Sequence, residues 1–129
     1  MAERTLARLM FASAARDIDT VATLLHHADS HDSVIGFHAQ QAVEKLPKCA
    51  LSSAGVSYRR TRDIAELLET PRPITSFPHH HLPIRLMNEL NPFAVEARYG
   101  LESAGRLDRS SIVAKLAAPR LWNEGPLNA

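Results

Sequence analysis

The stretch that decides the fold is residues 37–45, Phe37-His38-Ala39-Gln40-Gln41-Ala42-Val43-Glu44-Lys45. Residues 37, 40, 41 and 44 recur at spacings of three and four, which places their side chains on one face of a helix. Beside this face runs an apolar stripe with helical spacing, formed by Ile35, Ala39, Ala42, Leu46 and Cys49. The pattern predicts a helix that begins with Asp32 or Ser33 as its cap and ends at Ala54, just before Gly55.

The polar edge of this helix needs hydrogen-bond partners, because an unpaired buried polar group costs about 1–3 kcal/mol. Two interpretations stay open. Either another helix meets this edge and satisfies it through a polar network, or the edge lines a ligand cleft or a dimer seam. The residues concerned are Phe37, His38, Gln40, Gln41 and Glu44.

Apolar residues at spacings of three and four predict further helices on both sides of this one. The first frays near residues 26–30 and carries the stripe Leu6, Met10, Ala14, Ile18, Val21, Leu25 and Ala28. A short helix spans residues 63–69, and a fourth begins at Pro83 with Leu86, Met87 and Leu90 facing inward. The last begins at Asp108 or Ser110.

Prolines set the expected interruptions, because a proline inside a helix removes a hydrogen bond and costs about 3 kcal/mol. Pro47 predicts a kink in the second helix or its break into two pieces. Pro92 predicts an interruption of the fourth helix, which continues after a bend. Pro119 predicts the end or a bend of the last helix, with Trp122 as an anchor before a loose C-terminal tail. Residues 71–83, rich in proline and histidine, predict a loop.

The composition favours one helical domain and excludes several classes of protein. The chain has 129 residues, of which 45% are hydrophobic and 5% aromatic, and its net charge is +1. The scarcity of aromatic residues argues against a sandwich or a barrel, so we expect one domain over residues 1–129, an all-α, up-and-down bundle of four to five helices. The near-neutral charge excludes a strongly basic nucleic-acid wrap. The single cysteine, Cys49, excludes an intrachain disulfide and a multi-cysteine zinc site.

The hydropathy pattern predicts a protein without membrane contact. No apolar run approaches the roughly 20 residues that span a bilayer. The N-terminal residues lack the uninterrupted apolar core of a signal peptide, because Glu3, Arg4 and Arg8 interrupt them. We therefore expect a soluble, cytoplasmic protein.

Residues 37–45 closely resemble the phrase Phe-His-Ala-Gln-Gln-Ala-x-Glu-Lys on the second helix of the HEPN family (higher eukaryote and prokaryote nucleotide-binding domain), in its prokaryotic stand-alone branch. Further matches follow in order along the chain, roughly over residues 5–115: Asp17-Ile18, Gly55-Val56, Arg60-Thr61-Arg62-Asp63-Ile64 and Arg98-Tyr99. The resemblance implies an all-helical bundle and frequent homodimers. It also implies roles in nucleotide binding, RNA cleavage or toxin–antitoxin pairing with small nucleotidyltransferases.

The resemblance also supplies a test for catalysis, since the active ribonucleases of this superfamily carry an arginine, four to six residues and then a histidine. Only Arg72 and His79 satisfy that spacing, so they are the candidate catalytic residues. They lie in the predicted loop, whereas cleavage needs both side chains held rigidly toward one phosphate. Arg62 and Gly100 also replace the histidine and the proline usual in the family. We therefore expect no enzyme and no cofactor; any catalysis would be that of a metal-independent endoribonuclease.

Arginines gather just before the predicted helix at residues 63–69. A helix N-terminus attracts anions, and guanidinium groups hold phosphate bidentately. The candidate phosphate ligands toward a nucleotide or RNA are Lys45, Arg59, Arg60, Arg62 and Arg98. Alternatively, the arginines of this loop are solvated or pair with nearby glutamates. The run His79-His80-His81 predicts no metal site, because adjacent residues of an extended chain point to opposite sides.

Two classes of function follow from the sequence. The first is a nucleotide- or RNA-associated HEPN protein, the partner of a small nucleotidyltransferase in a toxin–antitoxin-like pair. We expect it to form a homodimer through the faces of its longer helices. The alternative is a catalytically inert helical module for dimerisation or interaction, which fits the loop position of Arg72 and His79.

Overall fold

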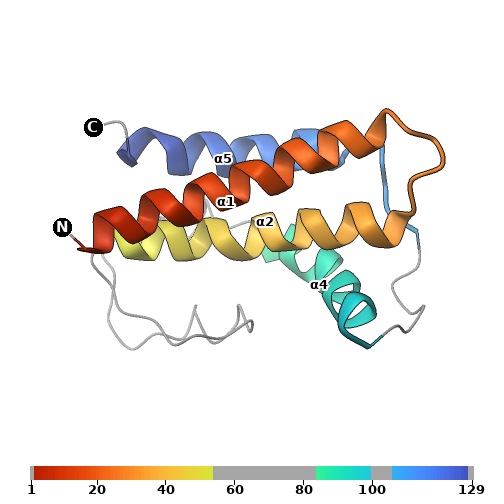
Figure 1. Cartoon of the computed structure of the whole chain (residues 1–129), viewed down its shortest axis with the longest axis horizontal. Helices are drawn as coiled ribbons and strands as arrows, with labels where there is room; N and C mark the ends of the chain where they lie inside the picture. The colour runs from red at the N-terminus through yellow and green to blue at the C-terminus, as the bar shows by residue number, and fades with distance from the viewer. Residues whose placement is uncertain (1, 54–83, 100–105, 128–129) are drawn as a thin grey trace.

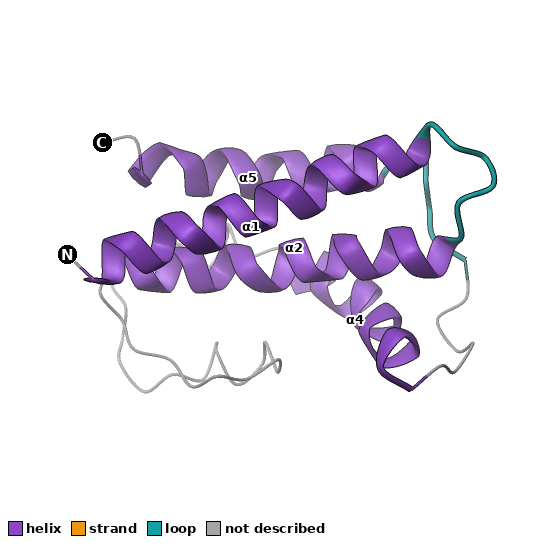
Figure 2. Ribbon diagram, viewed as in Figure 1, coloured by secondary structure: helices purple, strands orange, loops and turns teal. Residues whose placement is uncertain are grey.

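The computed structural model describes residues 2–53, 84–99 and 106–127. They form four helices, α1 (Ala2–Leu25), α2 (Asp32–Ser53), α4 (Ile84–Tyr99) and α5 (Ile112–Leu127), and contain no strand (Figure 2). The prediction of an all-α bundle is therefore confirmed. The predicted helix at residues 63–69 and the predicted loop at residues 71–83 lie outside the described residues. None of the described helices has the length and apolarity that a bilayer crossing requires.

The bundle is built around α2, which contacts α1, α4 and α5. Figure 1 shows α1, α2 and α5 with their long axes side by side, while α4 packs against α2 at an angle. The chain reverses direction between α1 and α2, so these two helices are antiparallel. This arrangement leaves α2 with neighbours on several sides, and its polar edge is therefore enclosed by other helices over part of its length.

The core joins the apolar faces of all four described helices. Its main cluster consists of Ala14, Ile18, Val21, Ile35, Ala39, Ala42, Val43, Leu46, Leu86, Met87, Leu90, Phe93, Leu107, Ile112 and Leu116. The stripe predicted on α2 is buried throughout. On α1 the middle of the predicted stripe is buried. The prediction is wrong at both ends of the stripe, because Leu6 is 46% exposed and Ala28 is exposed.

A close approach of α1 to α2 explains why a different residue from the predicted one is buried at the start of α1. Ala7 is fully buried there instead of Leu6, and its carbonyl oxygen accepts a hydrogen bond from the Cys49 thiol at 3.3 Å. A methyl side chain lets the two backbones come this near, whereas a leucine at the same point would not fit. Cys49 is buried in this small cluster, which confirms its interpretation as a core residue.

A second close approach joins α2 to α4. Gly36 lies directly against the ring of Phe93, and a Cβ atom at this position would overlap the ring carbons. Phe93 is itself buried in the core. The absence of a side chain at Gly36 thus allows α4 to cross α2 at this point.

The helix ends and breaks predicted at prolines are wrong, whereas a kink or bend at each proline stays a prediction. α2 continues through Pro47, α4 through Pro92 and α5 through Pro119 as far as Leu127. Trp122 consequently lies inside α5 and does not precede a loose tail. α2 and α4 are anchored in the core on both sides of their prolines, and burial of an aliphatic side chain contributes about 1.5–3 kcal/mol. α5 is anchored before its proline by Ile112 and Leu116. Several such side chains outweigh the roughly 3 kcal/mol that one interior proline costs.

α2 begins at Asp32, as the predicted start required, but the capping role predicted for Asp32 needs correction. Asp32 does not cap α2, because its carboxylate accepts hydrogen bonds from the Leu107 amide at 3.1 Å and from Arg109 Nε at 2.5 Å. Arg109 also donates to the carbonyl oxygen of Ser30. Burial raises the pKa of Asp32, but these hydrogen bonds and the positive charges of Arg109 and Arg106 outweigh it, so the pKa lies below 3.8. Asp32 thus ties the start of α2 to the segment before α5.

α5 begins at Ile112, later than the predicted start at Asp108 or Ser110. The Asp108 carboxylate accepts hydrogen bonds from the hydroxyls of Ser110 and Ser111, both at 2.7 Å. These contacts form a turn ahead of the helix and hold the pKa of Asp108 below its usual value. The first helical hydrogen bond, from the Lys115 amide to the Ser111 carbonyl, closes only after this turn.

Candidate functional site

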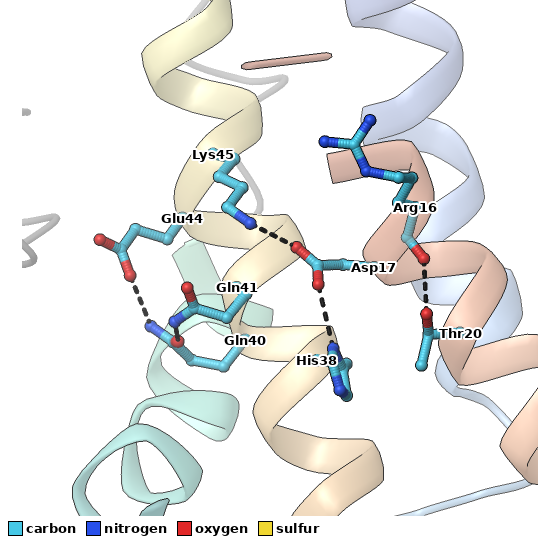
Figure 3. Close-up of polar contacts among 8 residues, drawn as sticks. All are labelled: Arg16, Asp17, Thr20, His38, Gln40, Gln41, Glu44 and Lys45. Atoms are coloured by element: carbon cyan, nitrogen blue, oxygen red, sulfur yellow. Dashed lines mark hydrogen bonds and ion pairs between the residues drawn. The ribbon is translucent and has the colours of Figure 1, made fainter. Parts of the chain in front are cut away.

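The polar side chains of α2 form two separate networks, which leave the helix on different sides (Figure 3). The first, here named the Asp17 cluster, consists of Asp17 on α1 with His38 and Lys45 on α2. One carboxylate oxygen of Asp17 lies 3.0 Å from His38 Nδ1, and the other accepts from Lys45 Nζ at 2.6 Å. The three side chains are 13%, 30% and 26% exposed, respectively. One carboxylate thus holds two residues that lie almost two helical turns apart on α2.

The second network, here named the glutamine–glutamate chain, runs along α2 itself. Gln41 Nε2 donates to Gln40 Oε1 at 2.8 Å, and Gln40 Nε2 donates to Glu44 Oε2 at 3.2 Å. Lys48 Nζ completes the chain with a hydrogen bond to Glu44 Oε1 at 3.1 Å. Gln40 and Glu44 are buried, with exposed fractions of 1% and 6%. The charge of Glu44 is therefore compensated by a lysine that is itself largely shielded from solvent.

The two networks satisfy the polar edge of α2 within the chain. The Asp17 cluster agrees with the first of the two interpretations of residues 37–45, a polar network that reaches a neighbouring helix, whereas the glutamine–glutamate chain is satisfied within α2. Phe37 adds an edge-to-face contact with the His38 ring, at a centroid distance of 5.6 Å. Lining of a ligand cleft or a dimer seam by Phe37, His38, Gln40, Gln41 and Glu44 stays a prediction.

The chemistry of the Asp17 cluster is that of an oriented imidazole. Asp17 fixes the His38 ring through Nδ1, and Nε2 makes no hydrogen bond with the residues that the structure describes. A carboxylate in this position sets both the tautomer and the direction of the ring. Lys45, by contrast, has its charge neutralised by Asp17 at close range. The cluster therefore presents one uncommitted ring nitrogen and no uncompensated charge of its own.

The predicted phosphate ligands are not gathered in the described part of the chain. Lys45 belongs to the Asp17 cluster in the middle of α2, whereas Arg98 is exposed in the last turn of α4. The other candidate phosphate ligands and the candidate catalytic pair lie outside the described residues: Arg59, Arg60, Arg62, Arg72 and His79. Their roles stay predictions.

Two members of these networks were not predicted as site residues. Lys48 stands four residues after Glu44, a spacing that favours an ion pair on a helix, so its role was open to prediction. Asp17 lies 21 positions before His38, and nothing in the local pattern indicates that the two meet. Among the described residues, no group of three or more His, Cys, Asp or Glu side chains is placed to hold a metal ion.

Comparison with known proteins identifies the family. The family model of the HEPN domain matches residues 7–117, which is most of the chain. The match includes both networks on α2 and reaches from α1 into α5. No curated protein and no solved structure matches the chain. Because the matched range covers most of its length, the chain belongs to the HEPN domain family.

Proposed function

We propose that the chain associates with nucleotides or RNA and is the partner of a small nucleotidyltransferase in a toxin–antitoxin-like pair. The observation that carries this proposal is the HEPN match over residues 7–117, since at the level of the family the HEPN domain is associated with nucleotides and RNA. The pairing with a nucleotidyltransferase rests on the resemblance of residues 37–45 to the prokaryotic stand-alone branch.

The end of α4 supports contact with nucleic acid. Arg98 is exposed there, and its neighbour Tyr99 has 65% of its surface exposed. A guanidinium group binds phosphate oxygens bidentately, and an exposed aromatic ring stacks on unpaired bases. Arg98 and Tyr99 therefore offer the two contacts by which proteins hold a single strand.

The buried part of α2 supports a preorganised surface. A buried glutamate and a buried glutamine are expensive to desolvate, and breaking such a network costs more than it would on the surface. Glu44 and Gln40 are nevertheless fully engaged in the glutamine–glutamate chain. A satisfied network of this kind fixes the side chains along one face of α2, which suits recognition of a defined ligand or partner.

Binding of single-stranded RNA tests the first half of the proposal. We expect a short RNA oligonucleotide to bind the purified chain, with an affinity that falls as salt rises because phosphate contacts release counterions. Arg98→Gln and Tyr99→Ala are expected to weaken binding by about three- to tenfold each. Arg8→Gln is the matched control, since Arg8 is also exposed but lies on α1.

Co-expression tests the second half. We expect the neighbouring gene to encode a small nucleotidyltransferase, and we expect the two proteins, when produced together, to co-elute in size-exclusion chromatography. A chain that binds neither AMP, nor RNA, nor this nucleotidyltransferase would contradict the proposed function. Equal RNA affinity of Arg98→Gln, Tyr99→Ala and the wild type would show that the end of α4 is not the contact surface.

The proposal includes a homodimer through the faces of the longer helices, and Gln41→Leu separates two roles of the polar edge of α2. Gln41 is half-buried and donates to Gln40. If the edge forms a dimer seam, the substitution changes the association constant measured by analytical ultracentrifugation. If the edge lines a ligand cleft, association is unchanged and ligand binding is lost.

A further inference from the structure

A cleft of about 450 Å³ lies between α4 and α5 and is separate from the polar face of α2. It is lined by Arg85, Leu86 and Glu89 of α4 and by Lys115 of α5. Small-molecule sites in proteins commonly have volumes of about 300–1,000 Å³. The cleft has the volume of a small-ligand site, but it is roughly half open to solvent and would enclose a ligand only in part.

The charges around the cleft favour an anion. Lys115 Nζ lies 3.2 and 3.3 Å from the two carboxylate oxygens of Glu89. Arg85 is exposed and makes no ion pair with the residues that the structure describes. Two cations and one carboxylate leave a net charge of +1 at the cleft, and the guanidinium group of Arg85 is available to a ligand.

The ion pair between Glu89 and Lys115 leaves room for a ligand on the lysine. Both side chains are partly exposed, by 41% and 37%, so solvent screens their attraction. A lysine ammonium carries three N–H donors, and a carboxylate at this distance does not occupy them all. Glu89 thus holds Lys115 at the cleft while the ammonium keeps the capacity to donate to a second anion.

The backbone on both sides of the cleft is held in place. Leu86 is buried in the core from α4, and Ile112 and Leu116 are buried from α5, on either side of Lys115. The Lys115 amide donates to the Ser111 carbonyl at 3.0 Å, in the first turn of α5. Little ordering of the main chain is therefore needed when a ligand binds, which favours affinity.

We propose that this cleft binds the phosphate group of a mononucleotide. Arg85 holds two phosphate oxygens with its planar fork, and Lys115 donates to a third. Leu86 lines the cleft but is only 6% exposed, so the contact with the ligand is carried by the two cations. The choice of a mononucleotide rests on the proposed function, whereas the anion site itself rests on the residues of the cleft.

This site is distinct from the RNA-contacting end of α4. Arg85 lies in the first turn of α4 and Arg98 in the last, so the two are separated by about 20 Å at a rise of 1.5 Å per residue. One mononucleotide cannot span that distance. The two arginines can therefore be tested independently.

Isothermal titration of the full chain with AMP at low salt tests the proposal. Arg85→Gln and Lys115→Gln are each expected to weaken AMP binding about tenfold. Glu89→Gln is expected to strengthen it severalfold, because it removes the one negative charge at the cleft. Arg8→Gln, at an exposed arginine of α1, is expected to leave it unchanged. Melting temperatures of all four variants verify that each is folded, and a loss of stability alone would not produce changes of opposite sign.

Three outcomes would overturn the proposal. If AMP binding is lost in Arg98→Gln but kept in Arg85→Gln and Lys115→Gln, the nucleotide binds at the end of α4 and not in the cleft. The proposed function would then still hold. Inorganic phosphate that binds as tightly as AMP reduces the cleft to a general anion site. RNA binding without any AMP binding excludes a mononucleotide as the ligand. Failure of AMP, RNA and the nucleotidyltransferase together would instead refute the proposed function.

Discussion

The Asp17 cluster is expected to stabilise the contact between α1 and α2, and Asp17→Asn measures this contribution. The substitution keeps the shape of the side chain and removes its charge, so Lys45 and His38 face a neutral amide. Hydrogen bonds to charged groups contribute about 1.5–3 kcal/mol when shielded, whereas exposed ion pairs contribute about 0–1 kcal/mol. Asp17 is only 13% exposed and its partners are about a quarter exposed. We therefore expect the free energy of unfolding to fall by about 1–2 kcal/mol.

The chain supplies its own matched control. Asp19 lies two residues further along α1 and pairs with Arg120 at 3.2 Å, but its side chain is 70% exposed. Asp19→Asn is therefore expected to cost less than about 0.5 kcal/mol. Urea unfolding followed by circular dichroism measures the free energy of unfolding of both variants. In thermal unfolding, Asp17→Asn is expected to lower Tm by about 3–10 °C. A double-mutant cycle with Lys45→Met isolates the pair. Equal losses for Asp17→Asn and Asp19→Asn would refute the argument that burial makes the difference.

Three more predictions follow from contacts in the core and between loops. Gly36→Ala is expected to lower the free energy of unfolding, measured in urea, by about 1–3 kcal/mol, because the new methyl group overlaps the Phe93 ring. Adding Phe93→Leu to the same chain should recover part of this loss. No recovery would disprove the overlap. The lowered pKa of Asp32 means that its contacts stabilise the fold above about pH 4 and are lost as pH falls through that pKa. Asp32→Asn should therefore lose less stability than the wild type between about pH 5 and pH 2, and parallel pH profiles would count against this. The Cys49 thiol is fully buried, so it should react with a thiol reagent only after denaturant is added. Rapid reaction of the native chain would show that α1 opens at Ala7.

The sequence predicted the parts of the fold that depend on local periodicity. The stripe of α2 and the middle of the stripe of α1 are buried as expected, because residues three and four apart share a helix face whatever packs against it. The burial of Ala7 and the exposure of Leu6 could not be predicted from periodicity. They depend on how closely α1 approaches Cys49, which is a property of the packed pair of helices.

Local rules failed where tertiary contacts outweighed them. Asp32 has the chemistry of a helix cap, yet Arg109 and the Leu107 amide offer its carboxylate stronger partners from a distant part of the chain. The prolines have the chemistry of helix breakers, yet the core holds α2 and α4 on both sides of theirs. The polar edge of α2 could be predicted from residues 37–45. The contact of Asp17 with His38 and the cleft at Arg85 and Lys115 could not, because they depend on how the helices pack.

Pro47 has a consequence for the local opening of α2. Its missing amide leaves the carbonyl of Val43 without the usual helical hydrogen bond, so the two halves of α2 are joined by one bond fewer. The ion pair between Glu44 and Lys48 spans this point from one half to the other. Amide hydrogen exchange in the last turns of α2 should therefore depend on that ion pair more than exchange near Ile35 does. A side-chain contact at the edge of the core thus sets how far the end of α2 opens while the rest of the bundle stays folded.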